Sequence, residues 1–154
     1  MKAVVLTIST TRARGEGEDV SGPKLVELCA QADVEAELRV VADDRDLIAA
    51  QMREIADHRQ ADSIFTTGGT GMTPDDVTPE ATRDVIDRDA PGYAETIRAE
   101  SRKYLDLGIL TRGVSGIRGR TLIINFPGTP NAVEQSWPVV EPTLKHACNT
   151  LRRV

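Results

Sequence analysis

The feature of this chain that most restricts its fold is the alternation of short β-branched runs with stretches of helical periodicity. Residues 3–8 (AVVLTI) form a nearly continuous apolar run, which is typical of a strand buried on both faces. Residues 34–41, 63–66 and 121–126 are further strand candidates. Strands that alternate with helices favour βα units around one sheet. The sequence therefore predicts a three-layer α/β/α domain with a mostly parallel sheet.

Three stretches carry apolar residues at the three- and four-residue spacing of an amphipathic helix. Their apolar faces consist of Leu25, Leu28, Cys29 and Ala32; of Ile48, Met52, Ile55 and Ala56; and of Val140, Leu144, Ala147, Cys148 and Leu151. Asp43 or Asp44 is expected to cap the second of these helices. The segment from about residue 79 to residue 103 is expected to form two helices that are separated at Pro91-Gly92.

The length and composition limit the class of protein. A chain of 154 residues can bury a substantial core, so we expect one domain over residues 1–154. Its apolar runs are shorter than the ~18 residues of a membrane span, and residues 3–6 are too few for a signal-peptide core. We therefore expect a cytoplasmic protein in which Cys29 and Cys148 act as small hydrophobic residues, not as a disulfide or a metal pair. A net charge of −5 with one Trp, two Tyr and two Phe argues against a surface for nucleic acids.

Three of the predicted strands are followed by loops rich in polar residues and glycine: residues 9–11, 68–71 and 127–130. Ligands of open α/β sheets bind beyond the carboxyl ends of the strands. Gly68-Gly69-Thr70-Gly71 has three glycines in four residues, and backbone without Cβ atoms can approach an anion closely. The loop matches neither G-x-x-x-x-G-K-[ST] nor G-x-G-x-x-G. A plain tight turn would also use glycines, but the sequence favours a phosphate-binding loop.

Two aspartates lie where they could serve a ligand on this loop. Pro79 disfavours helical angles at Thr78, so these two residues suit the N-cap and the first position of a helix. Asp76 is then left on the loop, where it could hold the magnesium that accompanies a nucleotide or simply cap a turn. Asp43 ends the second strand, but either it or Asp44 could cap the next helix. The sequence leaves open which of the two faces the loop.

Several other catalytic classes lack their residues. His58 and His146 lie far apart in helical patterns, and we expect both at the surface. There is no G-x-S-x-G motif and no arrangement of Cys with His that suits nucleophilic catalysis. The chemistry must therefore rest on backbone donors, carboxylates, hydroxyls and arginines.

A cluster of arginines precedes the last predicted strand. Arg112, Arg118 and Arg120 flank the segment 113–116 (GVSG). A stretch rich in arginine and glycine suits an anionic ligand in an otherwise acidic protein. Solvated loop charge is the alternative interpretation.

In their order along the chain, these motifs resemble the molybdopterin adenylyltransferase (MogA/MoaB) family, which includes the G domain of gephyrin and plant molybdenum-cofactor proteins. The matching segments are 19–23 (DVSGP), 67–71 (TGGTG), 73–82 (TPDDVTPEAT), 116–119 (GIRG), 121–125 (TLIIN) and 127–133 (PGTPNAV). One departure is visible. Many members have Ser-Asp after the first strand, whereas this chain has Ser9-Thr10.

The resemblance implies transfer of AMP from ATP to the terminal phosphate of molybdopterin, with Mg²⁺ as cofactor and pyrophosphate as the second product. It implies that Asp43 and Asp76 are the catalytic acids and the metal ligands. The nucleotide-binding residues would be Gly68, Gly69, Thr70, Gly71, Pro127, Gly128 and Asn131, and the molybdopterin-binding residues would be Arg112, Ser115 and Arg118. The family also implies a homotrimer or hexamer and a molybdenum-insertion protein that receives the product.

Two alternatives remain compatible with the same motifs. One is a molybdopterin-binding or scaffold protein of the family without transferase activity. The other is a relative of the competence-damage (CinA-type) domain that acts on another nucleotide-linked substrate. Because the chain retains Asp43, Asp76 and the whole glycine loop, the transferase is the favoured hypothesis.

Overall fold

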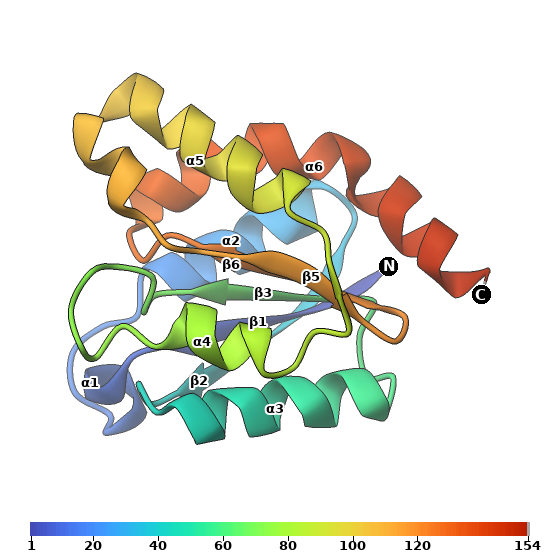
Figure 1. Cartoon of the computed structure of the whole chain (residues 1–154), viewed down its shortest axis with the longest axis horizontal. Helices are drawn as coiled ribbons and strands as arrows, with labels where there is room; N and C mark the ends of the chain where they lie inside the picture. The colour runs from blue at the N-terminus through green and yellow to red at the C-terminus, as the bar shows by residue number, and fades with distance from the viewer. Residues whose placement is uncertain (154) are drawn as a thin grey trace.

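The computed structural model describes residues 1–153 and contains a six-stranded sheet between two layers of helices (Figure 1). The strands are β1 (Lys2–Ile8), β2 (Glu35–Val41), β3 (Ser63–Thr67), β4 (Arg88–Asp89), β5 (Ser115–Arg118) and β6 (Thr121–Phe126). The helices are α1 (Thr10–Ala13), α2 (Ser21–Gln31), α3 (Arg45–Asp57), α4 (Thr78–Arg83), α5 (Gly92–Tyr104) and α6 (Pro130–Arg152), with a 3₁₀ turn η1 at Asp106–Leu110. The predicted fold class is confirmed.

The strand order places several loops at one edge of the sheet. The order is β2-β1-β3-β6-β5-β4, in which β2, β1, β3 and β6 are parallel while β5 and β4 are antiparallel to their neighbours. In register, Thr7 pairs with Thr67, and Thr67 pairs with Phe126. The chain therefore leaves β1, β3 and β6 at nearly the same level. The edge strands are β2, with exposed Glu35 and Glu37, and the two-residue β4.

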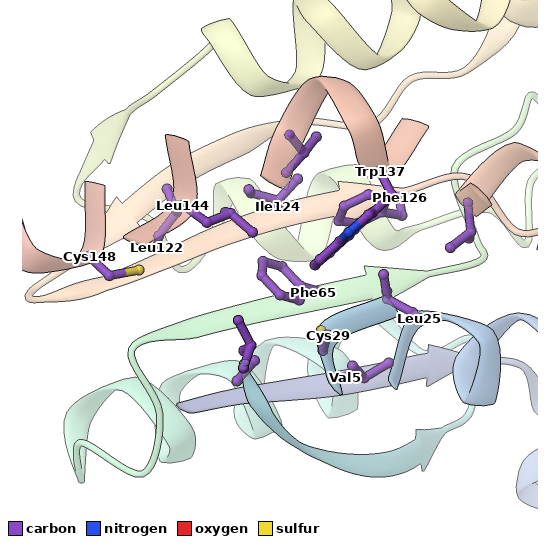
Figure 2. Packing of buried hydrophobic residues seen from close by; sticks show 14 of the residues in the cluster. Val5, Leu25, Cys29, Phe65, Leu122, Ile124, Phe126, Trp137, Leu144 and Cys148 are labelled. Carbon is purple, nitrogen blue, oxygen red and sulfur yellow. The ribbon is translucent and has the colours of Figure 1, made fainter. Parts of the chain in front are cut away.

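Each face of the sheet has its own hydrophobic core. Helices α2, α5 and α6 cover one face and α3 and α4 the other, as Figure 1 shows. The first core contains Phe65, Phe126 and Trp137, and Phe65 meets the other two rings edge to face at centroid distances of 5.7 and 6.0 Å (Figure 2). Three of the five aromatic residues of the chain are thus packed together beside β3 and β6, which support the loops that follow them.

The middle of the chain differs from the prediction of two helices separated at Pro91-Gly92. Helix α4 ends at Arg83, and residues 84–91 include strand β4 instead of a continued helix. The backbone N–H of Asp87 donates to the Ile117 carbonyl and that of Ala90 to the Ser115 carbonyl. This pairing with β5 replaces helical hydrogen bonds, and its partners lie too far along the chain for local periodicity to reveal them. Strand β5 was not among the strands predicted from the sequence.

Other expectations concern single residues. Cys29 and Cys148 are buried and unpaired, and burial raises the pKa of Cys29 to about 12 and that of Cys148 to about 11. They are therefore inert thiols in the core, as predicted. His58 and His146 are exposed, also as predicted. Within residues 1–153, every helix is too short or too polar to pass through a bilayer.

Candidate active site

A pocket of about 320 Å³ opens at the carboxyl edge of the parallel strands. Ser9 and Arg12 line it after β1, Gly68 after β3, and Gly128 after β6, while Asp19 closes it from the segment before α2. Figure 1 shows this edge on the left, with α1 below the long green loop between β3 and α4. Three of the loops that the sequence analysis selected therefore meet at one place, as the topology rule for open sheets predicts.

The glycine loop requires glycine at its first two positions. Gly68 has φ 100° and Gly69 has φ 67°, both in the left-handed region. A Cβ at Gly68 would overlap the carbonyl oxygen of Ile8, and one at Gly69 would overlap Oγ1 of Thr78. The sharp turn thus brings the chain from the end of β3 directly against the end of β1.

The loop leaves backbone donors free. Thr78 holds it in place, since its Oγ1 donates to the Gly68 carbonyl at 2.9 Å and its N–H donates to the Gly69 carbonyl at 3.1 Å. Within the described part of the chain, the N–H groups of Gly69 and Thr70 donate to no oxygen of the protein. Free N–H groups in a tight, positive-φ turn are suited to phosphate oxygens. The sequence predicts Thr78 as the N-cap of the helix that is now α4. In the structure Val77 is the N-cap, and the Thr78 hydroxyl serves the loop.

The two candidate caps of α3 have separate roles. Asp44 caps the helix, because its Oδ1 accepts from the N–H of Leu47 at 2.9 Å. Asp43 turns towards the start of α1, and its Oδ2 accepts from the N–H and the hydroxyl of Thr10. Its other oxygen, Oδ1, lies only 3.4 Å from where a Cβ of Gly69 would be. The structure therefore settles the open question: Asp43, and not Asp44, faces the glycine loop.

Asp76 lies at the other end of the same loop. Its Oδ2 accepts from the N–H of Thr73 at 2.9 Å and from the Thr73 hydroxyl at 2.7 Å, and it lies 2.8 Å from a Cβ position on Gly71. Partial burial opposes ionisation of this carboxyl, but the hydrogen bonds from Thr73 and from the backbone of Gly71 outweigh it. The pKa of Asp76 is therefore lowered, and the residue is a carboxylate at neutral pH. Asp43 and Asp76 thus flank the loop from opposite ends.

Arg112 holds the loop between these two acids. Its Nε donates to the Gly71 carbonyl and its Nη2 to the Asp76 carbonyl, both at 2.7 Å, and Nη1 pairs with Glu80 at 2.5 Å. The hydrogen bond from Arg112 is the main reason why the pKa of Glu80 is lowered. Since most of its donors are engaged within the protein, Arg112 stabilises the loop 70–76. The contact of Arg112 with molybdopterin, which the resemblance implies, stays a prediction.

Ser115 and Arg118 do not present free polar groups to the pocket. The buried hydroxyl of Ser115 donates to the Ala90 carbonyl and accepts from the N–H of Ala94. Arg118 pairs with Thr121, the first residue of β6, so it lies at the opposite edge of the sheet. There it forms a two-pronged ion pair with Asp57 at 2.8 Å. The antiparallel direction of β5 thus carries Arg118 away from the glycine loop. Its binding to molybdopterin, which the resemblance implies, stays a prediction.

Two side chains of the pocket were not selected from the sequence. Arg12 lines the pocket, and its Nε donates to the carbonyl of Glu18 at 2.9 Å. Within residues 1–153, its two Nη atoms donate to no other group of the protein. Asp19 accepts from the Thr7 hydroxyl at 2.7 Å and from the N–H of Gly22 at 3.1 Å, so it ties β1 to the start of α2. Asp19 belongs to the DVSGP segment, which was a signal that could have identified it. No motif in the sequence around Arg12 indicates that this residue lines a pocket.

Comparison with known proteins places this geometry in a family. Residues 4–146 match the family described as "Probable molybdopterin binding domain". The chain belongs to this family. It is 37% identical over 150 residues to the molybdopterin adenylyltransferase of Helicobacter pylori J99, covering 96% of this chain and 85% of that protein. The solved structure of the molybdopterin biosynthesis enzyme MoaB from Thermus thermophilus superposes with a TM-score of 0.90 at 39% identity, covering 97% of this chain and 95% of that one.

The same domain occurs within a much longer protein. The chain is 38% identical over 149 residues to the molybdenum cofactor synthesis protein cinnamon of Drosophila melanogaster. This match covers 96% of the present chain but only 25% of the Drosophila protein.

A methyl group at Gly69 should damage the loop. We expect Gly69→Ala to weaken ATP binding at least tenfold in calorimetry, because the left-handed backbone and the overlap with Thr78 both force the turn to move. The left-handed conformation alone costs an alanine about 1–2 kcal/mol. Gly119→Ala is the matched control, since Gly119 has φ 55° and no atom within 4 Å of its Cβ position. Equal ATP affinities of the two variants would contradict the assignment of the loop.

Replacement of Arg112 should affect both ATP binding and the stability of the fold, whereas replacement of Arg118 should affect stability alone. We expect Arg112→Ala to reduce the free energy of unfolding by about 1–3 kcal/mol and to weaken ATP binding more than tenfold. Arg112→Lys should restore little of the lost stability or ATP affinity, because an ammonium group cannot form the several hydrogen bonds of the planar guanidinium. Arg118→Ala removes a similar set of bonds at the far edge of the sheet, so it should lower stability and leave ATP affinity unchanged. Urea titration and calorimetry on both variants would check this, and a loss of ATP binding in Arg118→Ala would contradict it.

Proposed function

We propose that this protein transfers AMP from ATP to the terminal phosphate of molybdopterin in molybdenum cofactor biosynthesis, with release of pyrophosphate. The observation that carries the proposal is the glycine loop with free N–H groups between Asp43 and Asp76, in a chain of the molybdopterin-binding family. The names of relatives such as the Helicobacter pylori enzyme support it.

The proposed reaction needs no side chain that acts as a general base. The nucleophile is a phosphate monoester, whose second pKa of about 6 leaves it mostly deprotonated near pH 7. What the protein must supply is positioning and compensation of negative charge, as in other transfers of phosphoryl-type groups. In our proposal Gly68 to Gly71 receive the phosphates of ATP, and Pro127, Gly128 and Asn131 at the start of α6 complete the nucleotide site.

The residues present fit a magnesium ion. Magnesium is commonly bound by one or two carboxylates together with substrate phosphates, not by a cage of protein ligands. In the described residues no three His, Cys, Asp or Glu side chains cluster as a metal site, but the carboxylates of Asp43 and Asp76 flank the phosphate loop. These two residues would hold the ion, which would neutralise charge on the triphosphate.

Assembly and location are further parts of the proposal. We infer a homotrimer, or a hexamer of two trimers, because closed symmetric assemblies are the common outcome for soluble oligomers and the resemblance implies one. Light scattering should give three or six times the 16.7 kDa subunit mass, and a monomer at micromolar concentration would contradict it. ATP as substrate and reduced, buried Cys29 and Cys148 support the cytoplasm as the place of reaction. A molybdenum-insertion protein would receive the product.

Replacement of the two acids tests the transfer. We expect Asp43→Asn and Asp76→Asn each to lower the rate of adenylyl transfer by about 10²–10³, the loss typical for removal of one electrostatic contact to the transition state. Asparagine can still accept the bond from Thr73, so the fold should remain. Asp44→Asn is the matched control, because asparagine caps α3 equally well and Asp44 does not face the loop.

The assay would incubate each protein with ATP, Mg²⁺ and molybdopterin and detect adenylylated molybdopterin. Wild-type protein that binds molybdopterin but forms no product would favour the alternative of a binding or scaffold protein. Near-normal turnover in Asp76→Asn would contradict the metal-binding role and would show that Asp76 only caps the turn.

A further inference from the structure

Thr10 is the first residue of α1, directly after the end of β1. In the structure it makes three reciprocal hydrogen bonds with Asp43. Its N–H donates to Oδ2 of Asp43 at 2.8 Å and its hydroxyl donates to the same oxygen at 3.1 Å. In return, Oγ1 of Thr10 accepts from the N–H of Asp43 at 3.0 Å. Two residues separated by 33 positions therefore form one hydrogen-bonded unit.

These bonds fix which oxygen of Asp43 is available. Oδ2 is engaged twice by Thr10, whereas Oδ1 receives no hydrogen bond from the residues that the structure describes and is the oxygen that approaches Gly69. An aspartate side chain with free torsions would exchange its two oxygens and swing between positions. Held by Thr10, it presents a single oxygen to the loop.

The hydroxyl is not needed to attach α1 to the sheet. The N–H of Ser9 donates to the Val41 carbonyl at 2.8 Å, and the N–H of Thr10 reaches Asp43 independently of the side chain. Both backbone bonds persist if the hydroxyl is removed. The hydroxyl adds the bond to Oδ2 and the bond from the Asp43 N–H, and both hold Asp43 in one orientation.

The hydroxyl is also neutral, unlike a carboxylate. An aspartate at position 10 would set a second negative charge against Asp43, and like charges at this distance destabilise each other's ionised forms. Threonine instead donates to the carboxylate. The chain thus reaches a defined Asp43 geometry by hydrogen bonding.

We propose that Thr10 is a positioning residue that orients Asp43 so that its Oδ1 faces the phosphate loop and the magnesium bound there. This inference rests on the proposed function, because it concerns the same nucleotide site. It assigns Thr10 no contact with substrate: it acts through Asp43.

The test is calorimetric titration with ATP, in excess Mg²⁺ and in EDTA, on the wild type and three variants. Thr10→Val should bind ATP about tenfold more weakly in Mg²⁺, the effect expected when a hydrogen bond to a charged group is lost. In EDTA its affinity should equal that of the wild type. Thr10→Ser should retain wild-type affinity. Thr11→Val is the matched control, since Thr11 is exposed and its side chain makes no hydrogen bond within the described residues.

A double-mutant cycle separates positioning from a general structural effect. In an Asp43→Asn background, Thr10→Val should cause no further loss of Mg²⁺-dependent ATP affinity. An equal loss in that background, an equal loss in EDTA, or unchanged binding by Thr10→Val would each overturn the role of Thr10 and leave the proposed function standing. Wild-type protein whose ATP affinity does not rise with Mg²⁺ would overturn the proposed metal role, and this inference with it.

Discussion

The parallel pairing of β1, β3 and β6 is the constraint on which the site depends. Parallel strands have their carboxyl ends at one edge, and the register here brings the chain out of all three at nearly the same level. The left-handed turn at Gly68 and Gly69 then packs the end of β3 against the Ile8 carbonyl at the end of β1. Neither the pocket nor the approach of Asp43 to the glycine loop would exist if one of these strands reversed direction.

The protein holds its polar loops in place mainly with bonds from side chains to backbone. Thr78, Arg112 and Thr67 each reach a carbonyl oxygen of a loop at the carboxyl edge. Asn125, fully inside, connects β6 to Thr66 of β3 and to Thr82 of α4 at 3.0 Å each. Such bonds fix carbonyl groups while N–H groups in the turn remain free. This division suits a loop whose ligand is an anion.

The parts of the structure that follow from local sequence were predictable. Strand β1 is a nearly continuous apolar run, β3 and β6 contain short runs of apolar residues, and the topology rule then places the loops after them at a common edge. Phosphate binding by Gly68 to Gly71 stays a prediction, although the turn has the geometry it needs. The choice between Asp43 and Asp44 could not be made, because it is decided by Thr10, which folds back from a distant part of the chain.

The features that the sequence does not reveal share a physical cause, which is pairing across long sequence separations. Strand β4 forms because it pairs with β5, and the sequence pattern of residues 84–91 does not indicate this pairing. The contacts of Arg112 with the loop could not be predicted, because its partners Gly71, Asp76 and Glu80 lie more than thirty residues away. The position of Arg118 at the edge opposite the glycine loop could not be predicted either, because the antiparallel direction of β5 is not visible in the sequence.

The two outer strands of the sheet also determine how copies of this protein can meet. One rim ends in the two charged residues of β4, which is too short to template another strand, and the other carries Glu35 and Glu37 along β2. Short edges and charges of this kind discourage sheet-to-sheet extension. Along β2, however, Leu38 and Val40 are exposed as well. Assembly through helices and loops would leave the strand hydrogen bonding of each subunit complete, whereas pairing along β2 would continue the sheet into the next copy.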